Sequence, residues 1–336
     1  MSKTDTNIPD FEDRFLEPEG WRWHSFTRKG RVIRFGTVSP KGRVPDAIVV
    51  CLPGLGEFGE KYFETAQTCL GMNLAFWIID WMGQGGSGRY LKNPQKRHGS
   101  NFQNDIDDLH YFYTEYIKHS SVHPDVGRIP AAMLAHSMGA NIGLRYLAQH
   151  PGIFECAAFT APMLGLKALE KTPMPFALVL SEFLHVFTGE NYVKGGRDWN
   201  PSMRLFDGDE ALSSDSARVK LHTQWFEARS ALQVGSVTYG WVHHALMSCA
   251  YLGRRSVLHT IETPCLFALA GREALVDNRK ARRGAKMLKN CKVLEFPDAG
   301  HEILMEKDDI RGRFFEAFYA LVKENIIDRP ETLKPF

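Results

Sequence analysis

One serine stands where an apolar run meets a helical pattern, in the segment AHSMG at residues 135–139. The apolar residues 131–135 predict a strand, and residues 138–149 predict a helix that stops before a proline. A serine on a sharp turn between a strand and a helix can attack a carbonyl carbon, provided that small residues such as Ala135 and Gly139 flank it. Such a serine could also be only a helix N-cap, so the interpretation of Ser137 as a nucleophile depends on partners elsewhere.

A neutral hydroxyl is a weak nucleophile, so Ser137 needs a general base and the base needs an acid that orients it. His301 lies in a loop after the last expected strand and before the final expected helix, and we interpret it as the base. Two carboxylates, Glu273 and Asp277, follow the strand expected at residues 265–270. We favour Glu273 because it comes directly after the strand end. Asp277 remains the alternative acid, although it is also well placed to cap the basic helix that follows it.

Attack on a carbonyl creates an oxyanion that fixed N–H groups must meet. The backbone N–H of Met138, the residue after the serine, is one expected donor. The other is the N–H of Leu55, in the glycine-rich turn PGLGE at residues 53–57 after an apolar run. An ordinary glycine-rich turn is the alternative for this segment. It is not a phosphate-binding loop, because no Gly-Lys-Ser or Gly-Lys-Thr follows it.

The elements that must position these residues are short, uniformly apolar runs separated by helical patterns. Such runs are typical of a parallel sheet covered by helices on both faces, so we predict an α/β, doubly wound fold with a mostly parallel sheet. An antiparallel strand is expected before the parallel ones, at residues 31–38. The expected parallel strands are Ala47–Leu52, Ala75–Ile79, Ala131–Ala135, Cys156–Thr160, Cys265–Ala270 and Val293–Phe296.

The alternation of strand and helix lapses in the middle of the chain, where proline, serine and aromatic residues are frequent. A stretch of this length between two core strands is best interpreted as an inserted cap or lid. We therefore predict a core of residues 1–162 and 257–336 with a helical cap at 163–256. Within the cap we expect Phe183, Leu184 and Phe187 to bind substrate, beside a fatty chain or on a membrane surface, although a lid helix that packs on the core would give the same pattern.

Composition excludes several classes of function. The 41 Lys and Arg residues against 39 Asp and Glu residues give a formal net charge of +2, which is too even for a nucleic-acid partner. The sequence contains no run of about 18 apolar residues, so we predict no membrane span. The polar N-terminus does not resemble a signal peptide. The cysteines lack metal-ligand spacing and are expected to be buried, reduced thiols: Cys51, Cys69, Cys156, Cys249, Cys265 and Cys291. We expect a cytoplasmic protein, with peripheral contact at the inner face of a membrane as a further option.

The chain resembles the branch of the α/β hydrolases that contains monoacylglycerol lipases and bacterial lysophospholipases. The matching segments are residues 53–57 with Lys61 and Tyr62, the run DWMGQGGSGR at 80–89, the serine turn, TAPM at 160–163, and GHEILME at 300–306. Residues 234–242 and 273–278 resemble the bacterial lysophospholipases in particular. The resemblance implies an α/β-hydrolase fold and a triad completed by a carboxylate at Glu273. The family commonly has His before Gly where this chain has Pro53, and Asp-His-Arg-Gly where this chain has residues 80–83. Both departures concern the identity of the substrate rather than the chemistry.

These observations predict a serine ester hydrolase that acts on lysophospholipids or monoacylglycerols without a metal or another cofactor. A carboxylesterase or acyltransferase that uses a small, non-lipid ester is the alternative within the enzymes. A binding module with this fold and no activity is the alternative outside them. Such modules usually lack the serine or the histidine, whereas Ser137 and His301 are both present here.

Overall fold

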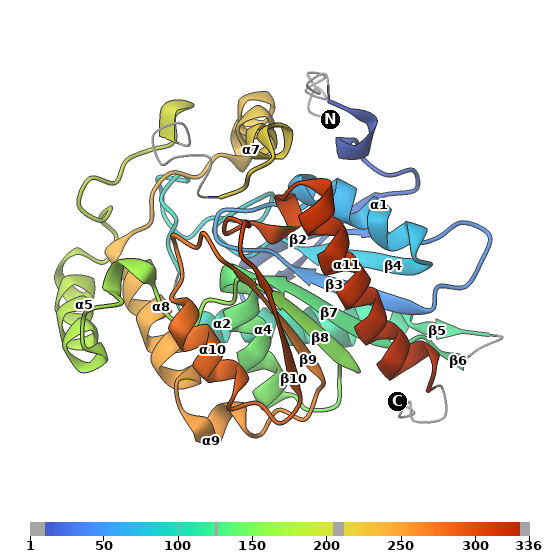
Figure 1. Cartoon of the computed structure of the whole chain (residues 1–336). Coiled ribbons are helices and arrows are strands. Elements are labelled where there is room, and N and C mark those ends of the chain that lie inside the picture. Colours follow the sequence, from blue (N-terminus) through green and yellow to red (C-terminus); the bar gives the residue numbers. More distant parts are fainter. Residues whose placement is uncertain (1–10, 100, 125–126, 204–211, 330–336) are drawn as a thin grey trace.

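A central sheet of eight strands organises the computed structural model, which describes residues 11–99, 101–124, 127–203 and 212–329 (Figure 1). The strand order is β1-β2-β4-β3-β7-β8-β9-β10; the pairs β1–β2 and β2–β4 are antiparallel and the other pairs are parallel. This arrangement confirms the predicted fold class. The strands are β1 (Arg22–Arg28), β2 (Arg31–Val38), β3 (Ala47–Leu52), β4 (Leu74–Ile79), β7 (Ala131–His136), β8 (Cys156–Thr160), β9 (Cys265–Ala270) and β10 (Cys291–Phe296), and the short pair β5 (Val122–His123) and β6 (Gly127–Arg128) lies outside the sheet.

Every expected strand is present, with one end shifted in three cases. The apolar patterns miss β1, because this edge strand is largely exposed and does not show a continuous apolar run. They also miss the first two residues of β10, Cys291 and Lys292, because the second edge strand is only partly buried. The six cysteines are free and five are buried, but Cys291 is only partly buried at this edge.

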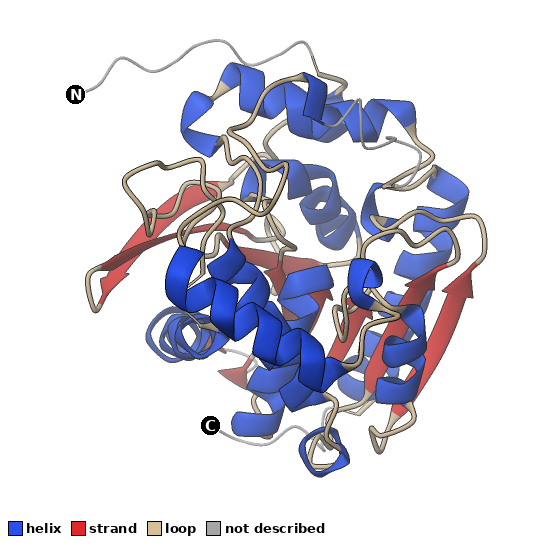
Figure 2. Cartoon of the chain, turned by 90° about the vertical axis from the view of Figure 1, so that its left-hand side faces the viewer, coloured by secondary structure: helices blue, strands red, loops and turns tan. Residues whose placement is uncertain are grey.

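Two apolar layers cover the sheet, as the uniformly apolar strands predict. Ile48 and Val50 of β3 face a layer that includes residues of α2, α4, α8 and α10, whereas Val49 and Cys51 face a layer with residues of α1 and α11. Figure 2 shows the strands as a sheet between helices. The helices are α1 (Phe63–Gly71), α2 (Phe102–Phe112), α3 (Lys118–Ser120), α4 (Ser137–Gln149), α5 (Met174–Thr188), α7 (Ser216–Ala228), α8 (Tyr239–Leu252), α9 (Arg255–Leu258), α10 (Asn278–Ala285) and α11 (Asp308–Val322).

The segment between β8 and β9 carries α5, α7, α8 and α9. Helix α8 packs on the core helix α4, where Ser248 donates a hydrogen bond of 2.5 Å to Asn141. Helix α5 packs in turn on α8, with Ser181 and His243 in hydrogen-bond contact at 3.2 Å. Both α5 and α7 stand away from the sheet in Figure 1. Helix α8 therefore connects α5 to the core.

The buried arginine of α7 holds that helix on the core. The Arg218 side chain is fully buried and forms ion pairs with Glu64 of α1, with Asp215 before α7 and with Asp308 of α11. It also donates a hydrogen bond of 2.9 Å to the carbonyl oxygen of Glu306. Because one guanidinium satisfies several acceptors at once, α7 has a defined position above α1 and α11.

Candidate active site

The turn that carries Ser137 lies between β7 and α4. Ser137 has a φ of +50°, a left-handed conformation that is uncommon for residues other than glycine. Gly139 is required behind it, because a Cβ there would clash with the carbonyl group of Leu52. Ala135 is fully buried at the end of β7, so a small side chain fits there as well. The strained turn places the hydroxyl at the carboxyl ends of the parallel strands.

A chain of hydrogen bonds joins the three predicted site residues. His301 Nε2 lies 2.9 Å from Ser137 Oγ, and His301 Nδ1 lies 2.8 Å and 2.9 Å from the two oxygens of Glu273. The Glu273 side chain is only 3 % exposed and accepts further hydrogen bonds from the N–H groups of Leu275 and Val276. The carboxylate is therefore fixed in position, and its contact with Nδ1 orients the imidazole toward the serine.

The charges of the pair Glu273 and His301 stabilise one another. Burial disfavours the charged imidazole and lowers its pKa, but the neighbouring Glu273 outweighs this effect, so the pKa of His301 is raised above its ordinary 6.5. Burial likewise acts to raise the pKa of Glu273, but His301 and the two N–H donors hold it below its ordinary value. The site thus has an ionised acid beside a histidine with increased proton affinity, as proton transfer from a serine requires.

Asp277, the alternative acid, has a different place. Its Oδ1 accepts the N–H of Arg279 at 2.9 Å and caps the first turn of α10, and the two side chains form an ion pair. No hydrogen bond joins Asp277 to His301 within the part of the chain that the structure describes. The geometry brings Glu273 to the histidine and assigns Asp277 the helix cap that its sequence position also suggested.

Side chains hold the glycine-rich turn on both sides of Leu55. Gln84 donates to the carbonyl oxygens of Gly54 and Glu57, each at 2.8 Å, and accepts the N–H of Gly56 at 2.9 Å. Glu57 accepts the N–H of Gly54. Among the described residues, no hydrogen bond uses the N–H of Leu55. This N–H is therefore available to an external acceptor.

Met138 offers the second expected donor. It is the second residue of α4, and the first N–H groups of a helix have no partner within the helix. Leu55 and Met138 line one small hollow together with Trp81, Gln84, Arg97 and other residues. Its volume is about 20 Å³, which is room for about one water molecule. The structure therefore brings the two residues with the predicted N–H donors to the same hollow.

A buried ionic cluster lies beneath the turn. The Lys61 ammonium, which is fully buried, contacts Glu57 at 2.7 Å and Glu302 at 2.8 Å. Burial acts to raise the pKa of Glu57, but Lys61 and His136 together hold it below its ordinary value. Sequence reasoning missed the roles of Lys61 and Gln84. Both residues lie in segments that carry the family resemblance, but this pattern does not reveal their partners.

The predicted substrate-binding residues of α5 lie largely at the surface. Phe183 and Phe187 are 61 % and 70 % exposed, and Leu184 between them is half-buried. None of the three lines the hollow beside Leu55 and Met138. They belong to an outward face of α5 on which further apolar side chains are exposed: Phe176, Val179, Leu180 and Val186.

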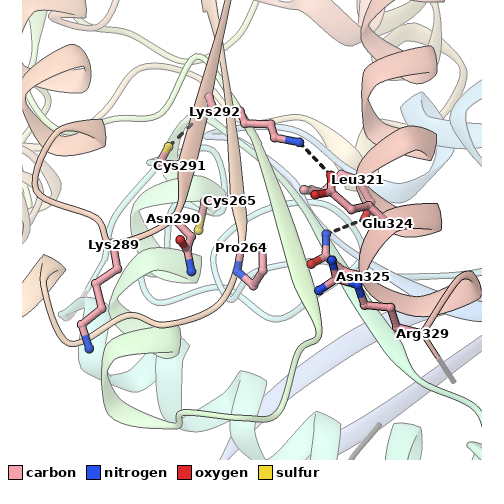
Figure 3. Close-up of a pocket in the computed structure, with 10 residues that line it drawn as sticks. All are labelled: Pro264, Cys265, Lys289, Asn290, Cys291, Lys292, Leu321, Glu324, Asn325 and Arg329. Atoms are coloured by element: carbon pink, nitrogen blue, oxygen red, sulfur yellow. Dashed lines mark hydrogen bonds and ion pairs between the residues drawn. The ribbon is translucent and has the colours of Figure 1, made fainter. Parts of the chain in front are cut away.

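A separate pocket of about 420 Å³ lies at the amino ends of strands β9 and β10, opposite the strand ends that carry the candidate site (Figure 3). Cys265 and Cys291 start these two strands, whereas Glu273 and His301 follow the other ends of the same strands. Lys292 in this pocket is paired with Glu324 at 2.7 Å (Figure 3). The pocket therefore belongs to a different region from the hydrogen-bonded triad.

Two further properties of the described residues bear on the site. Within these ranges, no group of three or more His, Cys, Asp or Glu side chains is arranged to hold a metal ion. None of the helices described here has both the length and the apolar character that a membrane crossing requires.

Two features define an α/β hydrolase. One is a mostly parallel sheet with helices on both faces, and the other is a serine, a histidine and a carboxylate that are joined by hydrogen bonds at the strand ends. Residues 43–308 match the family model described as "Serine aminopeptidase, S33", and the chain belongs to this family of serine hydrolases.

Known proteins of similar sequence and structure agree with this assignment. The chain is 30 % identical to lysophospholipase L2 of Escherichia coli K12, over 82 % of this chain and 79 % of that protein. It is 28 % identical to the human monoglyceride lipase over 35 % of this chain and 36 % of that protein. A crystal structure of monoglyceride lipase from Saccharomyces cerevisiae has a TM-score of 0.73 at 14 % identity and covers 95 % of this chain and 99 % of its own, which supports the fold. Together these similarities support an ester hydrolase.

Proposed function

We propose that this serine hydrolase cleaves the acyl ester of lysophospholipids or monoacylglycerols, with Ser137 as nucleophile, His301 as general base and Glu273 as the orienting acid. The observation that carries the proposal is the position of the His301 imidazole, within hydrogen-bond distance of both the serine and the carboxylate. The names of the relatives, lysophospholipase and monoglyceride lipase, support a lipid ester as the substrate class.

In the first step, the Ser137 oxygen bonds to the ester carbonyl carbon while its proton passes to His301 Nε2. The Nδ1–H stays on the imidazole and donates a hydrogen bond to Glu273, whose charge stabilises the imidazolium that forms. The oxyanion accepts hydrogen bonds from the N–H groups of Leu55 and Met138. The ester C–O bond then breaks, and the alcohol leaves with the proton from Nε2. Water attacks the acyl-enzyme in the same way and releases a fatty acid.

We propose that the cap spans residues 163–256 and contacts a lipid surface through the outward face of α5. Six large apolar side chains on one helix are at least 46 % exposed, which is costly in water and favourable at the boundary of a bilayer. A helix that lies on a surface needs neither the length nor the uniform hydrophobicity of a membrane span. Phe183, Leu184 and Phe187 would then bind the lipid phase in which the substrate resides.

Labelling with a fluorophosphonate probe tests the chemistry. The wild type should react through Ser137, and Ser137→Ala should not react although it folds. If the folded wild type does not react, the chain is a binding module rather than a hydrolase by this mechanism.

A substrate panel tests the ester class. Lysophosphatidylcholine, a monoacylglycerol and p-nitrophenyl acetate should be compared, with Ser137→Ala as the blank. Turnover of a long-chain lipid ester well above that of the acetate is expected. Turnover of the acetate alone would indicate a small-ester carboxylesterase.

Flotation with phosphatidylcholine vesicles tests the lipid contact. The double variant Phe183→Ser, Phe187→Ser should float much less than the wild type, because two exposed aromatic rings no longer enter the bilayer boundary. Val122→Ser is a matched control, since Val122 is 59 % exposed on β5, outside the cap. Equal loss in both variants would contradict a specific role of α5.

A further inference from the structure

An apolar pocket of about 260 Å³ lies outside the triad, and we call it the α8–α10 pocket after the helices that form most of it. Its apolar lining includes Leu164, Leu252 of α8 and Met287 beyond α10, and Met174 at the start of the cap helix α5 adds to it. None of the triad residues and neither Leu55 nor Met138 lines this pocket. Its volume is slightly below the range of roughly 300–1,000 Å³ that is usual for ligand pockets, so it accommodates one acyl segment.

The charge of the α8–α10 pocket is strongly unbalanced. Three cationic residues line it, Arg254, Lys280 and Arg283, and none of the acidic residues that the structure describes does. Lys280 extends across Gly165, where a Cβ would lie 3.1 Å from its ammonium nitrogen. Burial raises the pKa of Cys249, on the α8 side of the pocket, to about 12, and the charge of Lys280 acts to lower it, which is consistent with an ammonium close to this thiol.

Helix α10, which carries Lys280 and Arg283, provides an internal comparison. Helix α10 carries two other arginines, and each has an acidic partner: Arg279 pairs with Asp277 at 3.3 Å and Arg282 pairs with Glu295 at 2.8 Å. By contrast, Lys280 and Arg283 form no ion pair with any residue in the described part of the chain. The two arginines that have acidic partners, Arg279 and Arg282, thus do not line the pocket. Lys280 and Arg283, which have no acidic partner among the described residues, do line it.

We propose that the α8–α10 pocket binds a long-chain fatty acid, with the carboxylate between the three cations and part of the chain against the apolar lining. A carboxylate supplies the charge that the pocket lacks, and an alkyl chain buries apolar area at roughly 0.8 kcal/mol per CH₂. The proposal rests on the proposed function for the origin of this ligand, because hydrolysis of a lipid ester releases a fatty acid. Binding itself requires no turnover.

Isothermal titration of the full chain with dodecanoate, below its micellar concentration, tests the proposal. The active site is first blocked with a long-chain alkyl fluorophosphonate, or mutated to Ser137→Ala if the probe does not react, so that failure of the hydrolase proposal leaves this test intact. The variant Arg254→Gln, Lys280→Met, Arg283→Gln should bind dodecanoate at least tenfold more weakly. The matched control Arg279→Gln, Arg282→Gln removes two cations from the same helix and should bind like the wild type.

Two further measurements separate charge from hydrophobic contact. Ala250→Phe fills the pocket from α8 without a change in charge and should also weaken binding at least tenfold. Dodecanol and acetate, which each supply half of the ligand chemistry, should bind at least tenfold more weakly than dodecanoate. The proposal is overturned if the triple variant binds dodecanoate like the wild type, if the control variant is equally impaired, or if only anionic vesicles and not soluble dodecanoate distinguish the variants.

Discussion

Replacing Gln84 with methionine should reduce kcat strongly while leaving the triad in place. The methionine side chain has a similar length but makes none of the three hydrogen bonds that hold Gly54, Gly56 and Glu57 around Leu55. Complete loss of one oxyanion donor costs about 10²–10³ in kcat. We expect a smaller loss, about 10- to 100-fold, because Trp81 still holds the carbonyl of Pro53 and Glu57 still holds the N–H of Gly54.

The assay must separate the oxyanion from substrate binding and from stability. Steady-state kinetics should show a lower kcat with little change in KM, because Leu55 contacts the charge that develops only in the transition state. A trifluoromethyl ketone, which forms an oxyanion on the serine, should lose affinity in parallel with kcat/KM. The thermal midpoint should also fall, since each buried group left without a partner costs about 1–3 kcal/mol.

Gln67 offers a matched control, because it also donates hydrogen bonds to two backbone carbonyl groups, at 3.1 Å to Leu16 and 3.3 Å to Asp13. Gln67→Met should leave kcat unchanged. A folded Gln84→Met protein with kcat/KM within about threefold of the wild type would refute the assignment of the Leu55 N–H to the oxyanion hole, given the magnitude expected for such a donor.

Three other perturbations have defined outcomes. Glu273→Gln should lower kcat by about 10⁴ and Asp277→Asn by less than tenfold in an ester hydrolysis assay; the reverse order would exchange the acid and the cap. Burial acts against the charge on His301, but Glu273 raises its pKa above 6.5, so kcat/KM should fall as the pH drops through a midpoint above 6.5. Glu273→Gln should move that midpoint to lower pH, and an unchanged pH–rate profile would contradict the coupling. Arg218→Met leaves Glu64 without its closest cation and should lower the free energy of unfolding by about 3–5 kcal/mol, measured in urea, with little effect on the active-site chemistry.

The local pattern of apolar residues was sufficient to predict the parallel strands, because a parallel strand that is covered on both faces consists almost entirely of apolar residues. Residues 47–52 and 265–270 are fully buried along their length, and their expected bounds match β3 and β9. Strand β1 shows why the edge is harder. Its burial depends on the neighbouring strand on one side only, so its sequence has a mixture of exposed and buried positions.

Ser137, Glu273 and His301 were predictable because each follows the carboxyl end of a parallel strand. The supports of the turn were not predictable in the same way. Gln84 acts on backbone groups about 30 positions earlier in the chain, and Lys61 joins Glu57 to Glu302, which lies 241 positions after the lysine. Such contacts depend on the packing of several elements at once, and no local period in the sequence records them. The exposure of Phe183 was equally hidden, since an apolar stripe on a helix does not reveal whether another element covers it.

The separation of Ser137 and His301 along the chain also has a consequence for synthesis. Ser137 and His301 are 164 positions apart, and helices α5, α7, α8 and α9 lie between them in the sequence. At roughly 5–20 residues per second, a ribosome adds the histidine about 8–33 s after the serine. For most of this interval the nascent chain carries Ser137 and the apolar residues of α5 but not His301, the general base of the proposed mechanism. Under the proposed mechanism, the nascent chain therefore cannot cleave a lipid ester before His301 has been added.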